Sequence, residues 1–501
     1  MTPRLRQLNL VILITLVFTL FASAQNVTIL HTNDMHAQFV PLPATWIRET
    51  PKPQIGGMVA LDYFIQQQRQ KFPNALLLDA GDISTGTLLS KIEHNGAFNG
   101  GFVEMMNLIG YDAFTIGNHE FDEGQENLRN MMELIKFDVL SANLFLNGEQ
   151  LAPMAYKIYD VNGVRVGIIG LILSDLENVT AKKALVGIEV KDPIGSAQAV
   201  IDDIDAQTDL IVLLTHQGDD EDRALADGVR NADIIVGGHS HTRLTTAEIR
   251  NGIIIVQAGS KTRDLGRLTV SVASDTVSAF DFELMSTWVD SVKSPNPQMQ
   301  TLVQMFDSQI QAEYGQPIGT LHTDWENSND YETGLGNFIT DAMRDYTGTD
   351  FAMLNSGGIR KSMAPGAVTK MDVMEILPFS NYMVTFECTG KELLSLLQND
   401  ISGSIKNNYG LYQISGISYT YNVDAENNAT IISANVNGKP IQPNKIYLGT
   451  TVDFVMGRMQ ENYSVQNIDT DTKLIADVVI EYIQQNPEIH SKAEGRINKV
   501  D

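Results

Sequence analysis

The most informative stretch of the sequence is Gly117-Asn118-His119-Glu120-Phe121-Asp122, which directly follows the apolar run at 111–116. That run has the character of a buried strand, and polar residues after such strands lie where α/β sheets place their functional sites. Asn118 offers a neutral oxygen to a metal ion, and His119 can donate or accept a proton. Asp122 is close enough in the chain to orient His119, as a third group orients a general base. Taken alone, the stretch could also be a turn that holds a structural histidine.

Four other apolar runs end in similar polar motifs, which are Asp34-Met35-His36, Gly81-Asp82, Thr215-His216 and Gly237-Gly238-His239-Ser240-His241. Five of the nine histidines therefore follow predicted strands. Imidazole nitrogen and carboxylate oxygen without thiolate suit zinc, manganese, iron or cobalt. These groups are too many for one ion, whereas two ions about 3.5–4 Å apart that share one carboxylate would use them all.

The chain is strongly acidic, with a net charge of −26. This charge argues against a nucleic-acid polymer as partner, because such a partner requires a basic face. A small anionic substrate would have to find positive charge locally, from metal ions or a few arginines. The single cysteine, Cys388, excludes an intramolecular disulfide and a cysteine-based zinc site.

Residues 1–24 have the composition of a secretory signal peptide. Arg4 and Arg6 precede an apolar run at 8–21, and Ala22-Ser23-Ala24 is a small-residue cleavage pattern. A membrane anchor is the alternative, but the run is short for a spanning helix of about 20 residues. We expect a mature chain from Gln25 that is periplasmic or secreted and has no membrane contact after cleavage.

The rest of the chain divides into two domains of different pattern. Over 25–292, apolar runs alternate with helical segments, which favours a layered α/β domain with two sheets. Strands are expected at 27–30, 75–78, 164–173, 210–214, 233–236 and 253–256. A helix over 298–313, within a linker at 293–314, follows the proline-containing break. Residues 315–501 mix helices (334–346, 390–398 and 471–486) with strands and predict an α+β domain.

The order of these motifs resembles the bacterial periplasmic 5′-nucleotidase/UDP-sugar hydrolase family, whose first domain has the calcineurin-like metallophosphatase fold. The similarity runs from Ile29-Leu30-His31-Thr32-Asn33-Asp34 through nearly the whole mature chain. It implies a four-layer α/β/β/α domain joined by a helix to an α+β substrate-binding domain. It also implies two divalent metal ions (Zn, Mn, Co or Fe), one held by Asp34, His36 and His241, the other by Asn118, His216 and His239, with Asp82 between them.

The resemblance implies hydrolysis of 5′-nucleotides by a hydroxide bound to the two metal ions. His119 and Asp122 correspond to the catalytic dyad of the family. Two cations lower the pKa of a bound water and draw charge from the phosphoryl oxygens. His119 would then stabilise the transition state or protonate the leaving oxygen.

The second domain carries the substrate-binding motifs of the family. Asn355-Ser356-Gly357-Gly358-Ile359-Arg360 matches a loop in which the arginine contacts the substrate phosphate, and the residues carried over are Asn355, Gly357, Gly358 and Arg360. Phe379 and Phe454 match the two aromatics that enclose the nucleobase. Without the resemblance, the glycines indicate a plain turn and each phenylalanine a core residue.

Two departures leave the favoured nucleotide open. The segment 323–331 lacks the phosphate-binding arginines that the family has there, and Arg458 follows Phe454 where a Gly-Gly-Asp-Gly turn is usual. Arg458 could replace a phosphate contact. Alternatives on the same fold are a 2′,3′-cyclic nucleotide phosphodiesterase, a UDP-sugar hydrolase or a broad phosphomonoesterase, and more distantly a sulfur-ester hydrolase. An inactive nucleotide-binding surface protein is the alternative of another class. A monomer or a homodimer is expected.

Overall fold

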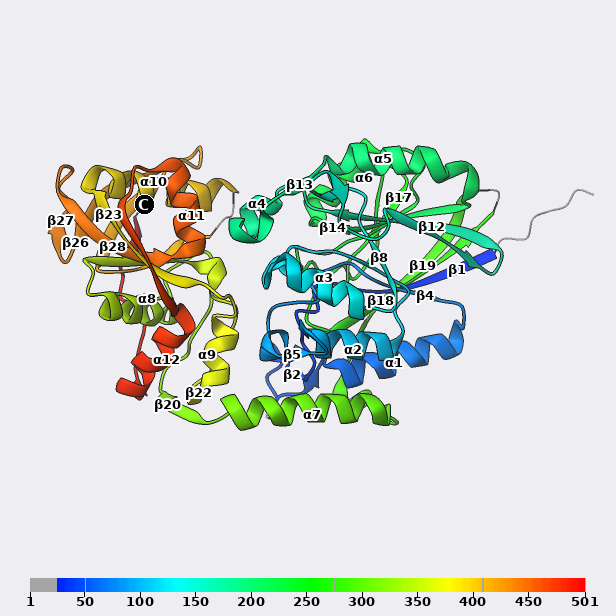
Figure 1. Cartoon of the computed structure of the whole chain (residues 1–501), viewed down its shortest axis with the longest axis horizontal. Helices are drawn as coiled ribbons and strands as arrows, with labels where there is room; N and C mark the ends of the chain where they lie inside the picture. The colour runs from blue at the N-terminus through cyan, green and yellow to red at the C-terminus, as the bar shows by residue number, and fades with distance from the viewer. Residues whose placement is uncertain (1–24, 50, 274, 408–409, 501) are drawn as a thin grey trace, which may run out of the picture.

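The computed structural model describes residues 25–49, 51–273, 275–407 and 410–500, which form two lobes joined by one long helix (Figure 1). The predicted signal peptide lies outside the described residues. Among the helices of the described part, none has the length and apolar character needed to cross a membrane.

The N-terminal lobe contains two six-stranded sheets. The first has the order β19 (Val277–Ser286), β18 (Asp264–Val272), β1 (Gln25–Thr32), β4 (Leu76–Asp79), β7 (Ala113–Thr115), β8 (Asp138–Leu140). The second has the order β11 (Tyr156–Val161), β12 (Val164–Ile172), β14 (Leu210–His216), β15 (Ile234–Val236), β17 (Ile253–Val256), β16 (Glu248–Arg250). The central strands β1, β4, β7 and β8, and likewise β12, β14, β15 and β17, run parallel. Their carboxyl ends therefore lie along one edge of each sheet.

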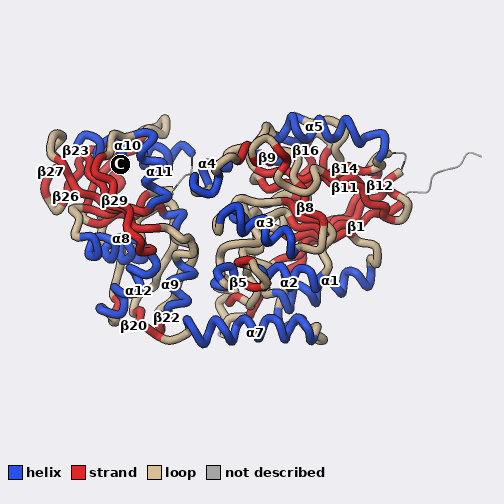
Figure 2. Tube along the Cα trace, viewed as in Figure 1, coloured by secondary structure: helices blue, strands red, loops and turns tan. Residues whose placement is uncertain are grey.

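The two sheets pack face to face and are covered by helices on their outer faces. Val27, Leu78, Val166 and Val212 belong to the apolar layer between the sheets. Helices α1 (Met58–Lys71), α2 (Gly100–Ile109) and α3 (Gly124–Leu134) cover the first sheet, and α5 (Pro193–Ile204) and α6 (Asp219–Gly228) cover the second. Figure 2 shows strands inside this lobe and helices outside it. The predicted four-layer α/β/β/α arrangement is confirmed, because parallel strands with two apolar faces must be covered on both.

Short elements complete the N-terminal lobe. They are β2 (Leu42–Pro43), β3 (Gln54–Ile55), β5 (Glu93–His94), β6 (Ala97–Phe98), β9 (Leu144–Leu146), β10 (Glu149–Gln150), β13 (Ile188–Val190) and α4 (Leu176–Val179). The single-turn helix η1 (Leu88–Lys91) lies near the second lobe, and η3 (Lys182–Leu185) follows α4.

The connecting helix α7 (Pro297–Tyr314) is anchored on the N-terminal lobe. Its amino end is capped by Asn296, whose side chain accepts a hydrogen bond from the backbone N–H of Gln298. Phe306 and Ile310 belong to the same core as α1 and α2. The Phe306 ring lies so close to α2 that a β-carbon on Gly101 would fall 2.5 Å from it. The C-terminal lobe therefore follows a helix that is fixed to the first lobe.

The C-terminal lobe is an α+β domain around a single core. Its largest sheet has the order β24 (Tyr412–Ser415), β21 (Phe351–Asn355), β28 (Ile446–Val452), β23 (Tyr382–Thr389), β29 (Gln466–Leu474). A second sheet has the order β27 (Lys439–Pro440), β26 (Ala429–Val436), β25 (Ile417–Val423), β31 (Ile497–Val500). A third has the order β22 (Gly366–Thr369), β20 (Pro317–Leu321), β30 (Glu488–Ile489). The helices are α8 (Gly334–Thr347), α9 (Lys370–Ile376), α10 (Gly390–Asn407), α11 (Asp453–Asn462) and α12 (Ile475–Gln485).

One predicted helix begins later than its sequence pattern indicates. The helix expected over 471–486 starts only at Ile475. The preceding residues belong to β29, which pairs antiparallel with β23 and places Leu474 opposite Tyr382. Strand pairing within the sheet overrides the local helical pattern at this end.

Candidate metal centre and substrate cleft

The polar motifs of the N-terminal lobe meet at the carboxyl edges of its two sheets. Asp34 and His36 follow β1, Asp82 follows β4, Asn118 and His119 follow β7, His216 ends β14, and His239 and His241 follow β15. Within the described residues, three groups of side chains have ligand atoms within 4.8 Å of one another. The groups are Asp34, His36 and His241; His36, Asp82 and His119; and Asp82, His216 and His239. All seven predicted ligands thus lie in one cluster, because Asn118 contacts both His216 and His239.

The backbone of this cluster is strained. Five of the seven predicted ligands have left-handed φ angles between 50° and 75°: Asp34, His36, Asp82, His239 and His241. Few residues other than glycine adopt this conformation. Such strain costs about 1–3 kcal/mol per residue and persists only where the surroundings hold it, as they do at functional sites.

Ligand atoms with lone pairs converge inside the cluster. Nδ1 of His36 donates to the Thr85 carbonyl at 2.8 Å, so Nε2 of the neutral ring bears a lone pair and faces Nε2 of His241 at 2.9 Å. Nδ1 of His216 donates to the Ala80 carbonyl at 2.7 Å. Its Nε2 lies 3.2 Å from two acceptors, Oδ1 of Asn118 and Oδ2 of Asp82. Acceptors that face one another in this way fit divalent cations with mixed nitrogen and oxygen ligands.

The charges of the cluster also favour a bound cation. Burial alone would raise the pKa of Asp82, but the imidazoles of His216 and His119 hold it well below its usual range. Burial opposes the charged form of His216, yet the carboxylates of Asp82 and Asp34 raise its pKa to about 10. Two buried carboxylates therefore attract positive charge into the place where the lone pairs meet.

Glu120 is a positioning residue that the sequence analysis missed, although it lies inside the quoted hexapeptide. Its carboxylate accepts hydrogen bonds from the backbone N–H groups of Gly117 at 2.8 Å and of Asp82 and Ser84 at 3.0 Å each. Burial, and next the charge of Asp82, raise the pKa of Glu120 to about 7. Glu120 thereby ties the loop after β7 to the loop that carries Asp82. An acidic residue beside His119 was the only signal in the sequence.

The structure brings His119 and Asp122 together as a hydrogen-bonded pair. Nδ1 of His119 lies 2.7 Å from Oδ2 of Asp122, and that oxygen also accepts a hydrogen bond from the Thr85 hydroxyl at 2.6 Å. Nε2 of His119 points toward the cluster and lies 3.9 Å from Asp82. Burial lowers the pKa of His119, but Asp82 and Asp122 together outweigh burial and raise it. His119 is thus oriented with a free ring nitrogen at the metal cluster.

The predicted substrate residues of the C-terminal lobe face this pair across the cleft. The Phe379 ring stacks on His119, with 5.8 Å between centroids and 25° between planes. Asn355, Gly358, Phe379 and Phe454 line one pocket of about 90 Å³ together with Asp122 and Lys183 of the N-terminal lobe. We call this pocket the aromatic pocket. Both phenylalanines are partly buried, so neither is a closed core residue.

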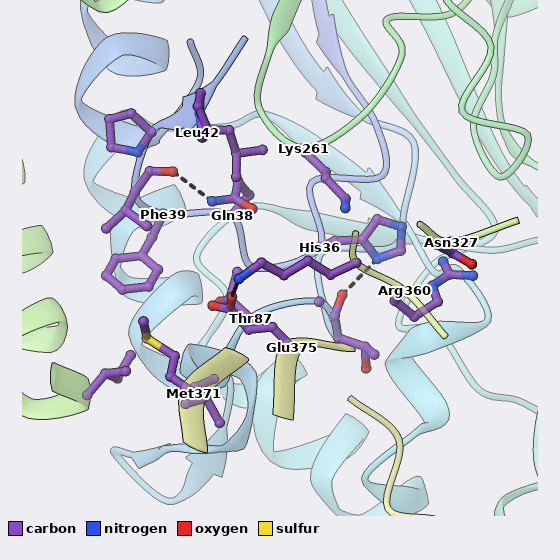
Figure 3. A pocket seen from close by; sticks show the side chains of 18 of the residues that line it. His36, Gln38, Phe39, Leu42, Thr87, Lys261, Asn327, Arg360, Met371 and Glu375 are labelled. Carbon is purple, nitrogen blue, oxygen red and sulfur yellow. Dashed lines mark hydrogen bonds and ion pairs between the residues drawn. The ribbon is translucent and has the colours of Figure 1, made fainter. Parts of the chain in front are cut away.

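A second and larger cavity, of about 520 Å³, opens between the lobes on the side of His36 and His241 (Figure 3). Gly357 and Arg360 line it from the C-terminal lobe. The Arg360 guanidinium lies 5.9 Å from the centroid of the Phe379 ring and forms no ion pair with a carboxylate of the described residues. Burial lowers its pKa. This interlobe cavity also contains Lys261, which the sequence analysis missed. Burial, and next the charges of Arg360 and Arg263, lower the pKa of Lys261 to about 8.

The two departures from the family pattern have distinct places in the structure. In the segment without arginines, Trp325 is buried in the core, whereas Asn327 and Asn329 line the interlobe cavity. The Arg458 guanidinium lies 4.7 Å from the centroid of the Phe454 ring. Arg458 lines a pocket that it shares with Phe454, whereas Arg360 lines the interlobe cavity. Arg458 therefore adjoins the aromatic side of the cleft and not the metal cluster.

Comparison with known protein families agrees with both lobes. The model of the calcineurin-like phosphoesterases matches residues 27–243, and that of the 5′-nucleotidase C-terminal domain matches residues 317–466. The chain belongs to the 5′-nucleotidase family of calcineurin-like metallophosphoesterases. It is accordingly a metal-dependent phosphoester hydrolase.

Three relatives illustrate this relationship. A 5′-nucleotidase precursor from Thermus thermophilus has a similar structure, with a TM-score of 0.85 and 26% identity over 95% of this chain and 100% of that one. Protein UshA of Escherichia coli is 28% identical over 85% of this chain and 84% of its own length. The trifunctional nucleotide phosphoesterase protein YfkN of Bacillus subtilis is 27% identical over 95% of this chain. This chain spans about a third of that longer protein, 35% of its length.

Proposed function

We propose that the protein is an exported 5′-nucleotidase with two divalent metal ions in its N-terminal lobe. The observation that carries the proposal is the convergence of three features on one cleft. These are the cluster of ligand atoms, the His119–Asp122 pair and the aromatic pocket. The domains proposed for this activity are a signal peptide at 1–24, a metallophosphatase domain at 25–292, a linker at 293–314 and a substrate-binding domain at 315–501.

The residues present fit two metal ions that share a carboxylate. Asp34, His36 and His241 would hold one ion, and Asn118, His216 and His239 the other. Asp82 belongs to two of the three ligand groups, which suits a bridging role. When bound, two such ions lower the pKa of a water molecule and draw charge from the phosphoryl oxygens. Zinc, manganese, cobalt and iron all suit this ligand set.

The remaining chemistry falls to side chains of the cleft. Asp122 holds the Nδ1 proton of His119, so Nε2 is the nitrogen that faces the substrate. A protonated His119 can donate from Nε2 to the leaving oxygen of the nucleoside. Arg360, whose guanidinium forms no ion pair within the described residues, offers hydrogen bonds to the phosphoryl oxygens, and such charge-assisted hydrogen bonds are among the strong ones. Phe379 and Phe454 offer aromatic faces for a base.

A substrate panel tests this proposal directly. Hydrolysis of AMP, UMP, UDP-glucose, ATP, 2′,3′-cAMP and p-nitrophenyl phosphate is measured with added Mn²⁺, Co²⁺ or Zn²⁺, and again after chelation. We expect the mononucleotides to have the highest kcat/KM and the chelated enzyme to be inactive. Equal kcat/KM for p-nitrophenyl phosphate and AMP would instead indicate a broad phosphomonoesterase. Preference for 2′,3′-cAMP would indicate a cyclic phosphodiesterase.

A further inference from the structure

Lys261 occupies an unusual position beside the metal cluster. It lines the interlobe cavity together with His36 and His241, and Figure 3 shows it and Arg360 converging near His36. The aromatic pocket shares no lining residue with this cavity and reaches the cleft at Asp122. A substrate whose base lies in the aromatic pocket and whose phosphate lies at the cluster would therefore leave the interlobe cavity unfilled.

The Lys261 ammonium makes no hydrogen bond or ion pair within the part of the chain that the structure describes. The second lysine of the cavity, Lys361, contrasts with it. The Lys361 ammonium donates to Asp372 at 2.9 Å and to Glu375 at 2.7 Å. Partly buried lysines ordinarily find such partners, because an unpaired charge loses hydration without compensation. Lys261 thus has charge available for a ligand.

The backbone holds Lys261 in place. Lys261 and Thr262 both have left-handed φ angles, 59° and 56°. Such angles are outliers for a β-branched threonine. Lys261 N–H donates to the Asp34 carbonyl at 2.8 Å, and the Thr262 hydroxyl oxygen accepts Gly57 N–H at 2.8 Å. A strained loop that its neighbours fix in this way is typical of a ligand contact.

The cavity has positive charge near His36 and apolar surface on its other side (Figure 3). Lys261 and Arg360 lie at the metal end, whereas Phe39, Leu42, Ile310 and Met371 line the walls. Two acidic residues line the cavity: Glu375 is engaged by Lys361, and Asp307 lies on α7 with the wall residue Ile310. The three basic lining residues Lys261, Arg360 and Lys361 therefore outnumber the carboxylates. This excess of positive charge is local, since the whole chain carries −26. The arrangement suits a compact anion, and lysine is an established point-charge contact for phosphate.

We propose that the interlobe cavity is a subsite for a second phosphate group of the substrate, with Lys261 as its specificity-determining contact. The proposal rests on the proposed function, because it takes a first phosphate to lie at the metal cluster. Arg360 lines the same cavity as Lys261. The volume of about 520 Å³ also leaves room for a substituent beyond the second phosphate, since it falls within the range of about 300–1,000 Å³ typical of small-molecule sites.

Binding measurements test this subsite without relying on turnover. The probes are methylenediphosphonate, which carries two phosphonate groups and is not hydrolysed, and orthophosphate, which carries one phosphate. Both are titrated calorimetrically into the metal-loaded enzyme with excess Mn²⁺, and metal content is measured afterwards. The variants are Lys261→Met, which keeps the aliphatic stem, Lys261→Arg, which keeps the charge, and Arg263→Met. Arg263→Met removes a positive charge from the same loop but outside the cavity lining.

We expect Lys261→Met to bind methylenediphosphonate roughly tenfold more weakly or worse, as loss of a charge-assisted contact does. Its orthophosphate affinity should stay close to that of the parent, Lys261→Arg should recover most of the loss, and Arg263→Met should match the parent. Equal weakening for both probes would overturn the proposal, because Lys261 would then serve the first phosphate or the metal ions. Unchanged methylenediphosphonate affinity would overturn it too. Absence of AMP hydrolysis by the parent would count against the proposed function alone, since these titrations need no turnover.

Discussion

The metal cluster and the aromatic pocket adjoin one cleft but are built in different ways. The cluster is buried, strained and held by hydrogen bonds from several loops of one lobe. The aromatic pocket draws its walls from both lobes and leaves its two phenylalanines partly exposed. Polar contacts between the lobes there include Lys183 with Asp453 at 3.1 Å, Lys91 with Ser380 at 3.2 Å, and Lys182 with Glu461.

On the proposed function, this difference separates chemistry from selection. The groups proposed to act on the phosphate lie in one lobe, whereas the groups proposed to contact the base lie where the two lobes meet. Substitutions in the cluster should therefore slow every substrate alike, whereas substitutions in the aromatic pocket should change the order of substrates.

The largest expected effect comes from Asp82→Asn. Asp82 belongs to two ligand groups and faces His216 at 3.2 Å, so its charge serves both proposed ions. We expect kcat to fall about 10³-fold or more for all substrates, since each metal ion contributes several kcal/mol. Metal content by plasma mass spectrometry should fall below that of His241→Ala, which loses a ligand of one ion only. Normal metal content and normal kcat in Asp82→Asn would show that the two proposed ions do not share the Asp82 carboxylate.

His119→Ala tests whether the metal cluster adjoins a group that acts without holding metal. We expect kcat to fall roughly 10²–10⁴-fold, the range for loss of a general acid or base. Metal content should match the parent, because His119 is not among the seven groups assigned to the two proposed ions. Loss of metal in this variant would place His119 among the ligands, as its proximity to His36 and Asp82 allows.

Phe454→Ala tests the aromatic pocket. If the ring stacks on a base, its loss should cost about 1–3 kcal/mol in kcat/KM for nucleotides. Turnover of p-nitrophenyl phosphate should stay near that of the parent. Phe379→Ala is the contrasting variant, because Phe379 also stacks on His119, so we expect it to slow both substrates and the nucleotide more. Equal slowing of both substrates by Phe454→Ala would make that ring a packing residue.

Asp400→Asn has the smallest expected effect and lies outside both the metal cluster and the aromatic pocket. Burial raises the pKa of Asp400 to about 7 from 3.8, against a hydrogen bond from Tyr412 N–H. A carboxyl whose folded pKa is raised binds its proton more tightly in the folded state, so stability falls as pH rises from about 4 through 7. Asparagine removes that loss and still accepts from Tyr412. We expect about 1–2 kcal/mol of added stability at pH 8 and none at pH 4, after a discount for the partly exposed side chain. Thermal unfolding at both pH values measures it, and kcat should not change.

The sequence alone predicted most of the N-terminal lobe. Apolar runs mark β1, β4, β12, β14, β15 and β17, because strands buried on both faces must be apolar throughout. Polar motifs directly after such runs indicated a ligand cluster, because parallel strands end at a common edge. The sequence also indicated the α+β character of the second lobe and the connecting helix. It placed the start of one helix too early, where the pairing of β29 with β23 decides the structure.

Tertiary structure alone decided which groups face one another across the cleft. Glu120 lies inside a motif that assigned it no role, and Lys261 lies in none; their roles depend on amides and charges from loops far away in the chain. The stacking of Phe379 on His119 joins residues 260 positions apart, and no local pattern encodes it. Periodicity records which side of a strand or helix is buried, which is a local property. Distances between loops of two lobes depend on how the sheets and α7 pack, and only the folded chain sets them.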